Sequence, residues 1–160
     1  MEPKIGVATF VIRTCVDNVE FLIGKRINDK NHSNNVWCLP GGGVNFKEDP
    51  KNASIRETRE EFGIEIEVPK ILVPYIYSSN LFGVSEKEQH YITLFFVSHI
   101  IDNSNPEIMK EIDGKKHSEW KWVTIEECKT LELFDHLRLI ISNDAVCGFL
   151  RGYKNSLCWR

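Results

Sequence analysis

A glycine run that leads into a helix crowded with carboxylates constrains this chain more than any other feature. It reads GGGVNFKEDPKNASIRETREEFGI over residues 41–64. Asp49 is a favourable N-cap, and Pro50 suits the first helical position because its missing N–H would have no intrahelical partner there. Gly63 suits the left-handed residue that often follows a helix. The segment therefore predicts a helix from Pro50 to Phe62.

The predicted helix has two different sides when residues are placed at about 100° intervals. Ile55, Thr58 and Phe62 share one side, which we expect to pack on a sheet. The other side carries the carboxylates, roughly 140° away by the same spacing, and we expect it to face a cavity or solvent. Its acidic members are Glu57, Glu60 and Glu61.

Like charges three and four residues apart destabilise a helix, so this crowding needs a compensating positive charge or full solvation. Carboxylate oxygens are ligands for Mg²⁺ or Mn²⁺, which then bind substrate phosphates. The preceding glycines would let the backbone approach a metal or a phosphate closely. An ordinary solvated acidic helix after a glycine turn is the alternative.

The rest of the sequence alternates short strand patterns with a few helices. Apolar or alternating runs predict strands over 4–13, 20–25, 36–39, two within 65–78, 91–101 and 119–123, with 91–101 central and buried. Asp17 and Asn18 suggest a hairpin turn, and 28–35 and 102–118 suggest loops. Thr124 with Glu127 forms a capping-box pattern, and 137–146 predicts a last helix. The pattern favours an α+β fold, with helices against a mixed sheet.

Length and composition narrow the class of protein. The 160 residues favour one domain over 1–160. A net charge of −3 argues against a long nucleic-acid partner, and no apolar run is long enough to span a membrane. The N-terminus lacks the layout of a signal peptide, so we expect a cytoplasmic location. The five scattered cysteines are expected to be free thiols rather than a zinc site.

The spacing of the acidic segment resembles the Nudix box, G-x5-E-x7-R-E-U-x-E-E-x-G-U, where U is a bulky aliphatic residue. One position departs from it, since Thr58 stands where the family usually has an aliphatic residue. Thr58 is expected on the packed side of the helix, so this departure predicts a packing change rather than lost chemistry. The fixed positions are matched by Gly42, Glu48, Arg56, Glu57, Glu60, Glu61, Gly63 and Ile64.

The resemblance implies an α/β/α sandwich and hydrolysis of a diphosphate linked to another moiety. It implies that Glu57, Glu60 and Glu61 hold Mg²⁺, for which Mn²⁺ can substitute, with help from the Gly41 carbonyl. It also implies that Arg56 holds a catalytic glutamate in place. Glu48, Gly42 and Gly63 would support the geometry of loop and helix. Glu60 and Glu61 both remain candidates for the general base.

Residues outside the box bear on the substrate. Lys25 and Arg26 end a strand just before the glycine loop and could meet a β- or γ-phosphate, although a solubilising pair is an equal alternative. Some members of the family take an extra acid from a distant loop. Glu107, Glu111, Asp113 and Glu119 are candidates, and solvated loop charge is the better interpretation of each.

Two segments, QHYITLFF at 89–96 and SEWKWVTIEE at 118–127, resemble small MutT-like Nudix enzymes that act on nucleoside triphosphates, including oxidised or pyrimidine nucleotides. The loop LPGGGV differs from the PKGH loop of dinucleoside-tetraphosphate hydrolases, and the first strand begins without the N-terminal extension usual in ADP-ribose hydrolases. We therefore expect a nucleoside triphosphate diphosphatase that yields a monophosphate and pyrophosphate. A homodimer is compatible with the resemblance.

Three alternatives remain. Within the enzyme class, the chain could hydrolyse nucleotide sugars or dinucleoside polyphosphates. A non-catalytic nucleotide sensor is disfavoured because such modules typically lose box glutamates, and this chain keeps them all. RNA decapping is weakened by the acidic net charge and the lack of a basic accessory region.

Overall fold

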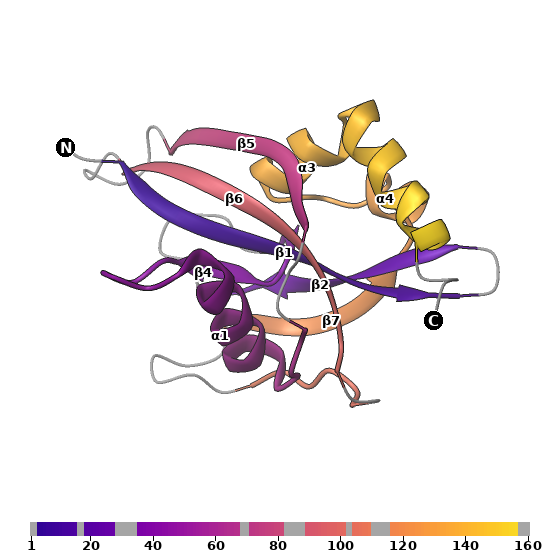
Figure 1. The fold of residues 1–160 in the computed structure, drawn as a ribbon, viewed down its shortest axis with the longest axis horizontal. Helices are drawn as coiled ribbons and strands as arrows, with labels where there is room; N and C mark the ends of the chain where they lie inside the picture. The colour runs from indigo at the N-terminus through magenta and orange to yellow at the C-terminus, as the bar shows by residue number, and fades with distance from the viewer. Residues whose placement is uncertain are drawn as a thin grey trace.

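The computed structural model describes residues 3–15, 18–27, 35–67, 71–81, 89–101, 104–109 and 116–156. These residues form a seven-stranded sheet with helices on both faces (Figure 1). The strands are β1 Lys4–Thr14, β2 Val19–Arg26, β3 Trp37–Cys38, β4 Gly41–Gly43, β5 Ile71–Leu81, β6 Gln89–His99 and β7 His117–Val123. The helices are α1 Pro50–Phe62, α2 Ile125–Lys129, α3 Asp135–Ile141 and α4 Asp144–Ser156.

Strand β1 lies at the middle of the sheet, whose order is β3-β2-β1-β6-β5. It pairs with β6 in parallel and with β2 and β4 antiparallel, while β7 pairs with β2 and β5 with β6. The mixed sheet predicted from the sequence is therefore confirmed. The expected central strand is also confirmed, since β6 lies between β1 and β5 and buries Phe95, Phe96 and Val97.

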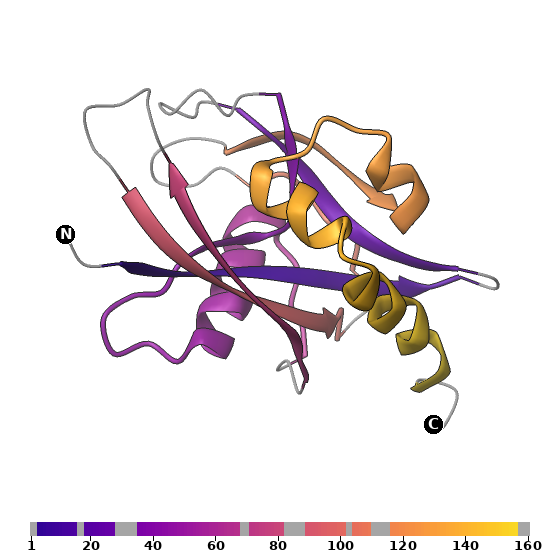
Figure 2. The same cartoon turned by 90° about the horizontal axis from the view of Figure 1, so that it is seen from above.

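Alternation along β1 divides the core between two faces. Val7 and Val11 pack on the face that α1 covers, whereas Phe10 and Ile12 point to the opposite face with the side chains of α3 and α4. Thr9 lies on the α1 side, and its hydroxyl is 2.5 Å from the hydroxyl of Ser54. Both views place α1 and the α3–α4 pair on opposite faces of the sheet (Figures 1 and 2), so the expected α/β/α sandwich is confirmed.

Three elements differ from the prediction. The single helix expected over 137–146 is two helices, because the Asn143 side chain caps α4 by accepting from the backbone N–H groups of Ala145 and Val146 at 3.0 and 3.2 Å. Among the described residues of 65–78, one strand begins, at Ile71, and Ile66 makes an isolated bridge to Ile100. His117 and Ser118 belong to β7 rather than to a loop.

Thr124 and Glu127 form the predicted capping box. Residue 17 and residues 28–34 lie outside the described residues, as do 111 and 113, so the hairpin turn, most of the expected loop and two of the distant acids are not described. The described cysteines, Cys15, Cys38, Cys128 and Cys147, are free thiols.

Candidate active site

Helix α1 begins and ends where local chemistry predicts. Asp49 Oδ1 accepts a hydrogen bond from the Lys51 N–H at 2.7 Å, and Pro50 occupies the first turn. Gly63 adopts the left-handed conformation at φ 66° and donates its N–H to the Arg59 carbonyl. Thr58 is fully buried, as expected, and its hydroxyl donates to the Ser54 carbonyl at 2.8 Å. The helix is therefore fixed at both ends, and its acidic residues are held at set positions.

The acidic side of α1 is more buried than the periodicity predicts. Glu57 is 5% exposed and Glu61 is 3% exposed, whereas Glu60 is exposed. Strand β4 causes this burial, because its glycine backbone runs directly across the helix. A Cβ atom at Gly42 would overlap the carboxyl group of Glu57. The Gly41 N–H donates to Glu61 Oε2 at 3.1 Å, so β4 both covers and binds the two acids.

Arg56 organises the surrounding carboxylates through all of its guanidinium nitrogens. Its Nε and Nη2 donate to the two oxygens of Glu48 at 2.8 and 2.9 Å, and Nη2 also donates to the Gly43 carbonyl at 2.9 Å. Its Nη1 donates to Glu57 Oε1 at 2.7 Å and to Glu60 Oε2 at 3.3 Å. The hydrogen bonds with Glu48 raise the pKa of Arg56 and lower the pKa of Glu48, so both groups remain charged near neutral pH.

The remaining oxygens of the two buried glutamates converge on one lysine. The ammonium nitrogen of Lys116 lies 3.5 Å from Glu57 Oε2 and 3.5 Å from Glu61 Oε1. Glu57 Oε2 is buried and accepts no hydrogen bond from the described residues. An oxygen taken out of water in this way is costly unless a cation satisfies it. The Glu57–Glu61 pair is therefore suited to hold positive charge.

The acidic cluster offers carboxylate oxygens, which are the kind of ligand that a divalent metal such as Mg²⁺ binds. As the side chains stand in the described ranges, no three His, Cys, Asp or Glu residues are gathered into a metal site. Lys116 lies between two of the three box glutamates, and the third, Glu60, is turned toward Arg56. The hard oxygens of Glu57 and Glu61 and the open approach of the Gly42 backbone fit Mg²⁺ chemistry. The donor set fits a divalent ion once Lys116 moves aside.

Lys25 and Arg26, the predicted phosphate contacts, have other neighbours in this structure. Lys25 forms an ion pair with Glu119 at 3.0 Å, and Arg26 stacks over the Phe134 ring at 4.7 Å. The distant acid Glu119 is thus occupied by Lys25, and Glu107 is exposed. Lys116 is a cation that the structure places at the acids in addition to Arg56, and the sequence had not indicated it as a site residue. The only signal was the basic pair Lys115–Lys116 ahead of a strand.

A buried histidine lies next to this lysine in the sequence. His117 Nε2 is 3.4 Å from Cys38 Sγ, its ring stacks on Phe62 at 5.1 Å, and burial lowers its pKa to about 3. Burial also raises the pKa of Cys38 to about 12. Both groups are therefore neutral near pH 7, and the pair packs β7 against α1 rather than forming a nucleophile with its base.

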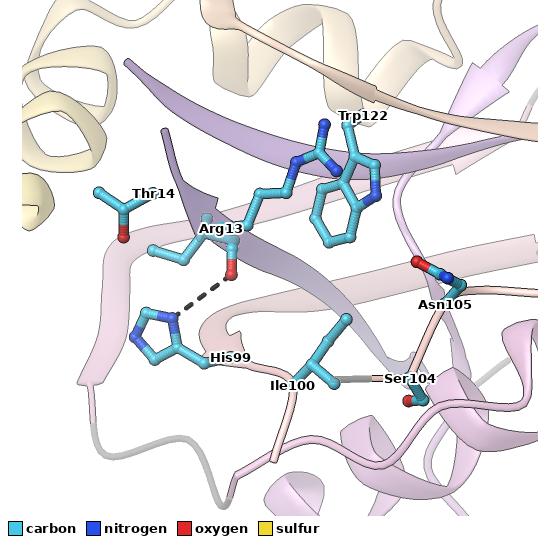
Figure 3. Close-up of a pocket in the computed structure, with 8 residues that line it drawn as sticks. Arg13, Thr14, His99, Ile100, Ser104, Asn105 and Trp122 are labelled. Atoms are coloured by element: carbon cyan, nitrogen blue, oxygen red, sulfur yellow. Dashed lines mark hydrogen bonds between the residues drawn. The ribbon is translucent and has the colours of Figure 1, made fainter. Parts of the chain in front are cut away.

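A cavity of about 330 Å³ lies at the other end of β1 (Figure 3). Its walls include the Arg13 guanidinium, stacked on Trp122 at 4.6 Å, and His99, whose Nδ1 lies 3.4 Å from the Ile12 carbonyl oxygen. Gly42 pairs with Val7, five residues earlier on the strand than Ile12, which corresponds to roughly 17 Å. The cavity is therefore separate from the acidic cluster.

None of the helices in the described residues is long and apolar enough to cross a membrane.

Comparisons with known proteins agree with this arrangement. A family model described as "NUDIX domain" matches residues 4–141. An RNA pyrophosphohydrolase of Pelagibacter ubique is 34% identical over 125 residues, covering 72% of this chain and 73% of that protein. An RNA pyrophosphohydrolase of Bartonella clarridgeiae is 29% identical over 128 residues, covering 68% and 70%. A MutT protein of Methanosarcina mazei has 26% identity and a TM-score of 0.65, covering 96% and 97%. The chain therefore belongs to the Nudix family and is a Nudix hydrolase of the MutT-like type that acts on phosphoric anhydrides.

Proposed function

We propose that this chain hydrolyses the triphosphate of a small nucleoside or deoxynucleoside triphosphate, oxidised and pyrimidine nucleotides included, to a monophosphate and pyrophosphate. The observation that carries the proposal is the pair of buried carboxylates, Glu57 and Glu61, anchored by Arg56 and the Gly41 N–H beneath a glycine strand. Such a pair does not by itself stabilise the fold, because burying two like charges is unfavourable. It suits a site that receives a cation and a phosphate.

Glu57, Glu60 and Glu61, with the Gly41 carbonyl, would hold Mg²⁺, or Mn²⁺ in its place. Nudix hydrolases generally use a divalent metal, which supplies neutralisation of phosphate charge and a lowered pKa of bound water. The residues of this chain do the rest. Arg56 keeps Glu57 in one orientation, β4 excludes water from one side of the acids, and Glu60 or Glu61 accepts the proton of the attacking water.

The 5′-triphosphate end of RNA is a second candidate substrate. This candidate is supported by two relatives that are RNA pyrophosphohydrolases and are 34% and 29% identical to this chain. The cleaved bond and the released pyrophosphate would be the same as for a free nucleotide. The acidic net charge favours the small substrate, because RNA binding depends largely on neutralising phosphates with basic residues.

The decisive experiment compares substrates in ¹⁸O-labelled water with Mg²⁺. The panel holds nucleoside triphosphates, a 5′-triphosphorylated RNA oligonucleotide, a nucleotide sugar and a dinucleoside tetraphosphate. We expect monophosphate and pyrophosphate from free triphosphates, with the highest kcat/KM in that class. Orthophosphate as the first product would refute the proposed cleavage. Preference for the RNA end would promote the second candidate, and turnover of the sugar or dinucleotide alone would replace both.

The wild type is compared with Glu61→Gln and with Glu126→Gln, an exposed acid on α2 that serves as the control. Glu61→Gln keeps the shape of the side chain and removes its charge. We expect turnover to fall by at least about a hundredfold, while the control stays at the wild-type rate. Tight nucleotide binding by a wild type without turnover would instead indicate a sensor.

We also propose that the chain works as a single domain in the cytoplasm, and we retain a homodimer as a hypothesis. Light scattering during gel filtration measures the mass of the particle. A mass near twice the 18.5 kDa of the chain would support the dimer, and a mass near that of one chain would refute it.

A further inference from the structure

The side chain of Lys116 enters the acidic cluster from the start of β7, 59 and 55 residues away in sequence from the acids that it contacts. Each of the two buried glutamates has one oxygen anchored elsewhere. Glu57 Oε1 accepts from Arg56, and Glu61 Oε2 accepts from the Gly41 N–H. Their other oxygens are both 3.5 Å from the same ammonium nitrogen. The lysine therefore lies between the two oxygens that a metal ion would use.

This geometry makes the lysine and a metal ion mutually exclusive. A divalent ion bound by carboxylate oxygens lies about 2.0–2.6 Å from each of them. An ammonium group that stays 3.5 Å from both oxygens would occupy nearly the same space and would repel the ion. Metal binding at Glu57 and Glu61 therefore requires Lys116 to leave.

Arg56 and Lys116 differ in how easily each could leave the acidic cluster. Arg56 is 25% exposed and donates to Glu48, Glu57, Glu60 and the Gly43 carbonyl, so its movement would break several hydrogen bonds together. The Lys116 side chain is 48% exposed and carries its charge on a flexible four-carbon stem. The exchange therefore moves Lys116 and leaves Arg56 in place.

We propose that Lys116 is the internal counter-ion of the metal-free site, and that a divalent cation binds by displacing its ammonium group from Glu57 and Glu61. The inference rests on the proposed function, because it assumes that these glutamates are the metal ligands. It adds a residue outside the glutamate-rich segment that sets the apparent metal affinity. It also explains how two buried carboxylates are tolerated without metal, since the ammonium offsets their repulsion.

The expected size of the effect follows from population arithmetic. In one state the Lys116 ammonium group contacts Glu57 and Glu61, and in the other it has moved away and leaves them open to a metal ion. If the first state outnumbers the second by about ten to one, the apparent dissociation constant for metal is raised about tenfold. Lys116→Met keeps much of the apolar stem and removes the charge. It should therefore bind Mg²⁺ about tenfold more tightly and should be less stable than the wild type when metal is absent.

The control is Lys51→Met. Lys51 is an exposed residue in the first turn of α1, so this variant removes the same charge without removing a contact to the acids. Mg²⁺ affinity is measured by isothermal titration calorimetry on all three proteins, and Tm is measured with chelator and with saturating Mg²⁺. We expect tighter binding only in Lys116→Met, together with a lower Tm in chelator and a smaller loss in Mg²⁺.

Each outcome decides a different claim. Unchanged or weaker Mg²⁺ binding by Lys116→Met would overturn the counter-ion proposal, as would an equal loss of Tm with and without metal, which marks a merely structural lysine. An equal gain in Mg²⁺ affinity in Lys51→Met would mean that the gain comes from the changed net charge of the protein, and this would also overturn the counter-ion proposal. A wild type that binds no Mg²⁺ would instead refute the proposed function.

A measurement on the wild type keeps the test independent of how the variant folds. Lysines are acetylated with acetic anhydride, with and without Mg²⁺, and the modified peptides are quantified by mass spectrometry. If metal releases the ammonium, the reactivity of Lys116 should rise several-fold in Mg²⁺ while Lys51 stays constant. No change, or protection of Lys116, would overturn the proposal.

Discussion

Adjacent glycines of β4 offer a matched pair of perturbations at the acidic cluster. A Cβ atom at Gly42 would overlap the carboxyl group of Glu57, whereas a Cβ atom at Gly43 would meet no atom within 4 Å. Neither glycine has a positive φ, so the backbone accepts alanine at both positions. Gly42→Ala and Gly43→Ala therefore differ in one respect, which is whether the added methyl group reaches Glu57.

The cost of Gly42→Ala can be worked out from the contacts of Glu57. The methyl group must push the carboxylate away from Arg56 Nη1, which donates to it at 2.7 Å. A hydrogen bond to a charged group contributes about 1.5–3 kcal/mol, and replacing glycine returns about 0.4–1 kcal/mol through the unfolded chain. The free energy of unfolding should therefore fall by about 1–2 kcal/mol. Gly43→Ala should be neutral or slightly stabilising.

The effect on metal binding should be larger than the effect on stability. Loss of an outer partner of a metal ligand typically costs about 10–100-fold in affinity. Under the proposed function Glu57 is itself a metal ligand, so displacing its carboxylate should cost at least that much. Urea unfolding gives the stability of each variant, and calorimetric titration with Mg²⁺ gives its affinity. If Gly42→Ala binds Mg²⁺ as tightly as Gly43→Ala, then Glu57 in the observed position is not a ligand.

Three further outcomes are expected, each measured by urea unfolding. Thr58→Val should change the free energy of unfolding by less than about 1 kcal/mol, because the Ser54 carbonyl keeps its helical N–H partner when the hydroxyl is removed. A fall in the free energy of unfolding of more than about 2 kcal/mol would contradict this. Hydrogen bonds from Arg56 lower the pKa of Glu48, so the stability that this pair contributes is complete above pH about 4.3 and is lost as the pH falls below that value. Glu48→Gln should therefore be less stable than the wild type at about pH 7, and its free energy of unfolding should fall less on acidification. Burial lowers the pKa of His117 to about 3, so only the unfolded chain gains this proton below pH about 6.5. Stability should then fall by up to about 1.4 kcal/mol per pH unit between about pH 6 and 4, and His117→Phe should remove that slope.

The parts of the structure that sequence reasoning predicted depend on local rules. The bounds of α1 follow from Asp49, Pro50 and Gly63, whose effects reach only a turn or so along the chain. Strand β6 follows from the apolar run in 91–101. The same kind of rule also applies to the boundary between α3 and α4, because Asn is a favoured N-cap and Asn143 caps α4. The apolar residues on both sides of Asn143 led instead to the prediction of a single helix.

The parts that were missed depend on contacts between distant segments. Burial of Glu57 and Glu61 requires β4 to lie across α1, which follows from its pairing with Gly6–Ala8 of β1 and not from helical periodicity. Lys25 faces Glu119 because β2 pairs with β7 at that register. Lys116 reaches the acids for a similar reason, since β7 lies next to β2. Spacing within one segment cannot show which cation will meet which acid.

The charges of the cluster explain how its carboxylates can lie so close together. Among the described residues, the carboxylates of Glu48, Glu57, Glu60 and Glu61 contact two cations, Arg56 and Lys116, which offset part of their mutual repulsion. Under the proposed function the phosphates of a substrate bind beside the metal, so a displaced ammonium group on the half-exposed, flexible Lys116 side chain would stay within reach of them. Under the counter-ion proposal, one lysine therefore compensates the acids before metal binds and stays available to attract substrate afterwards.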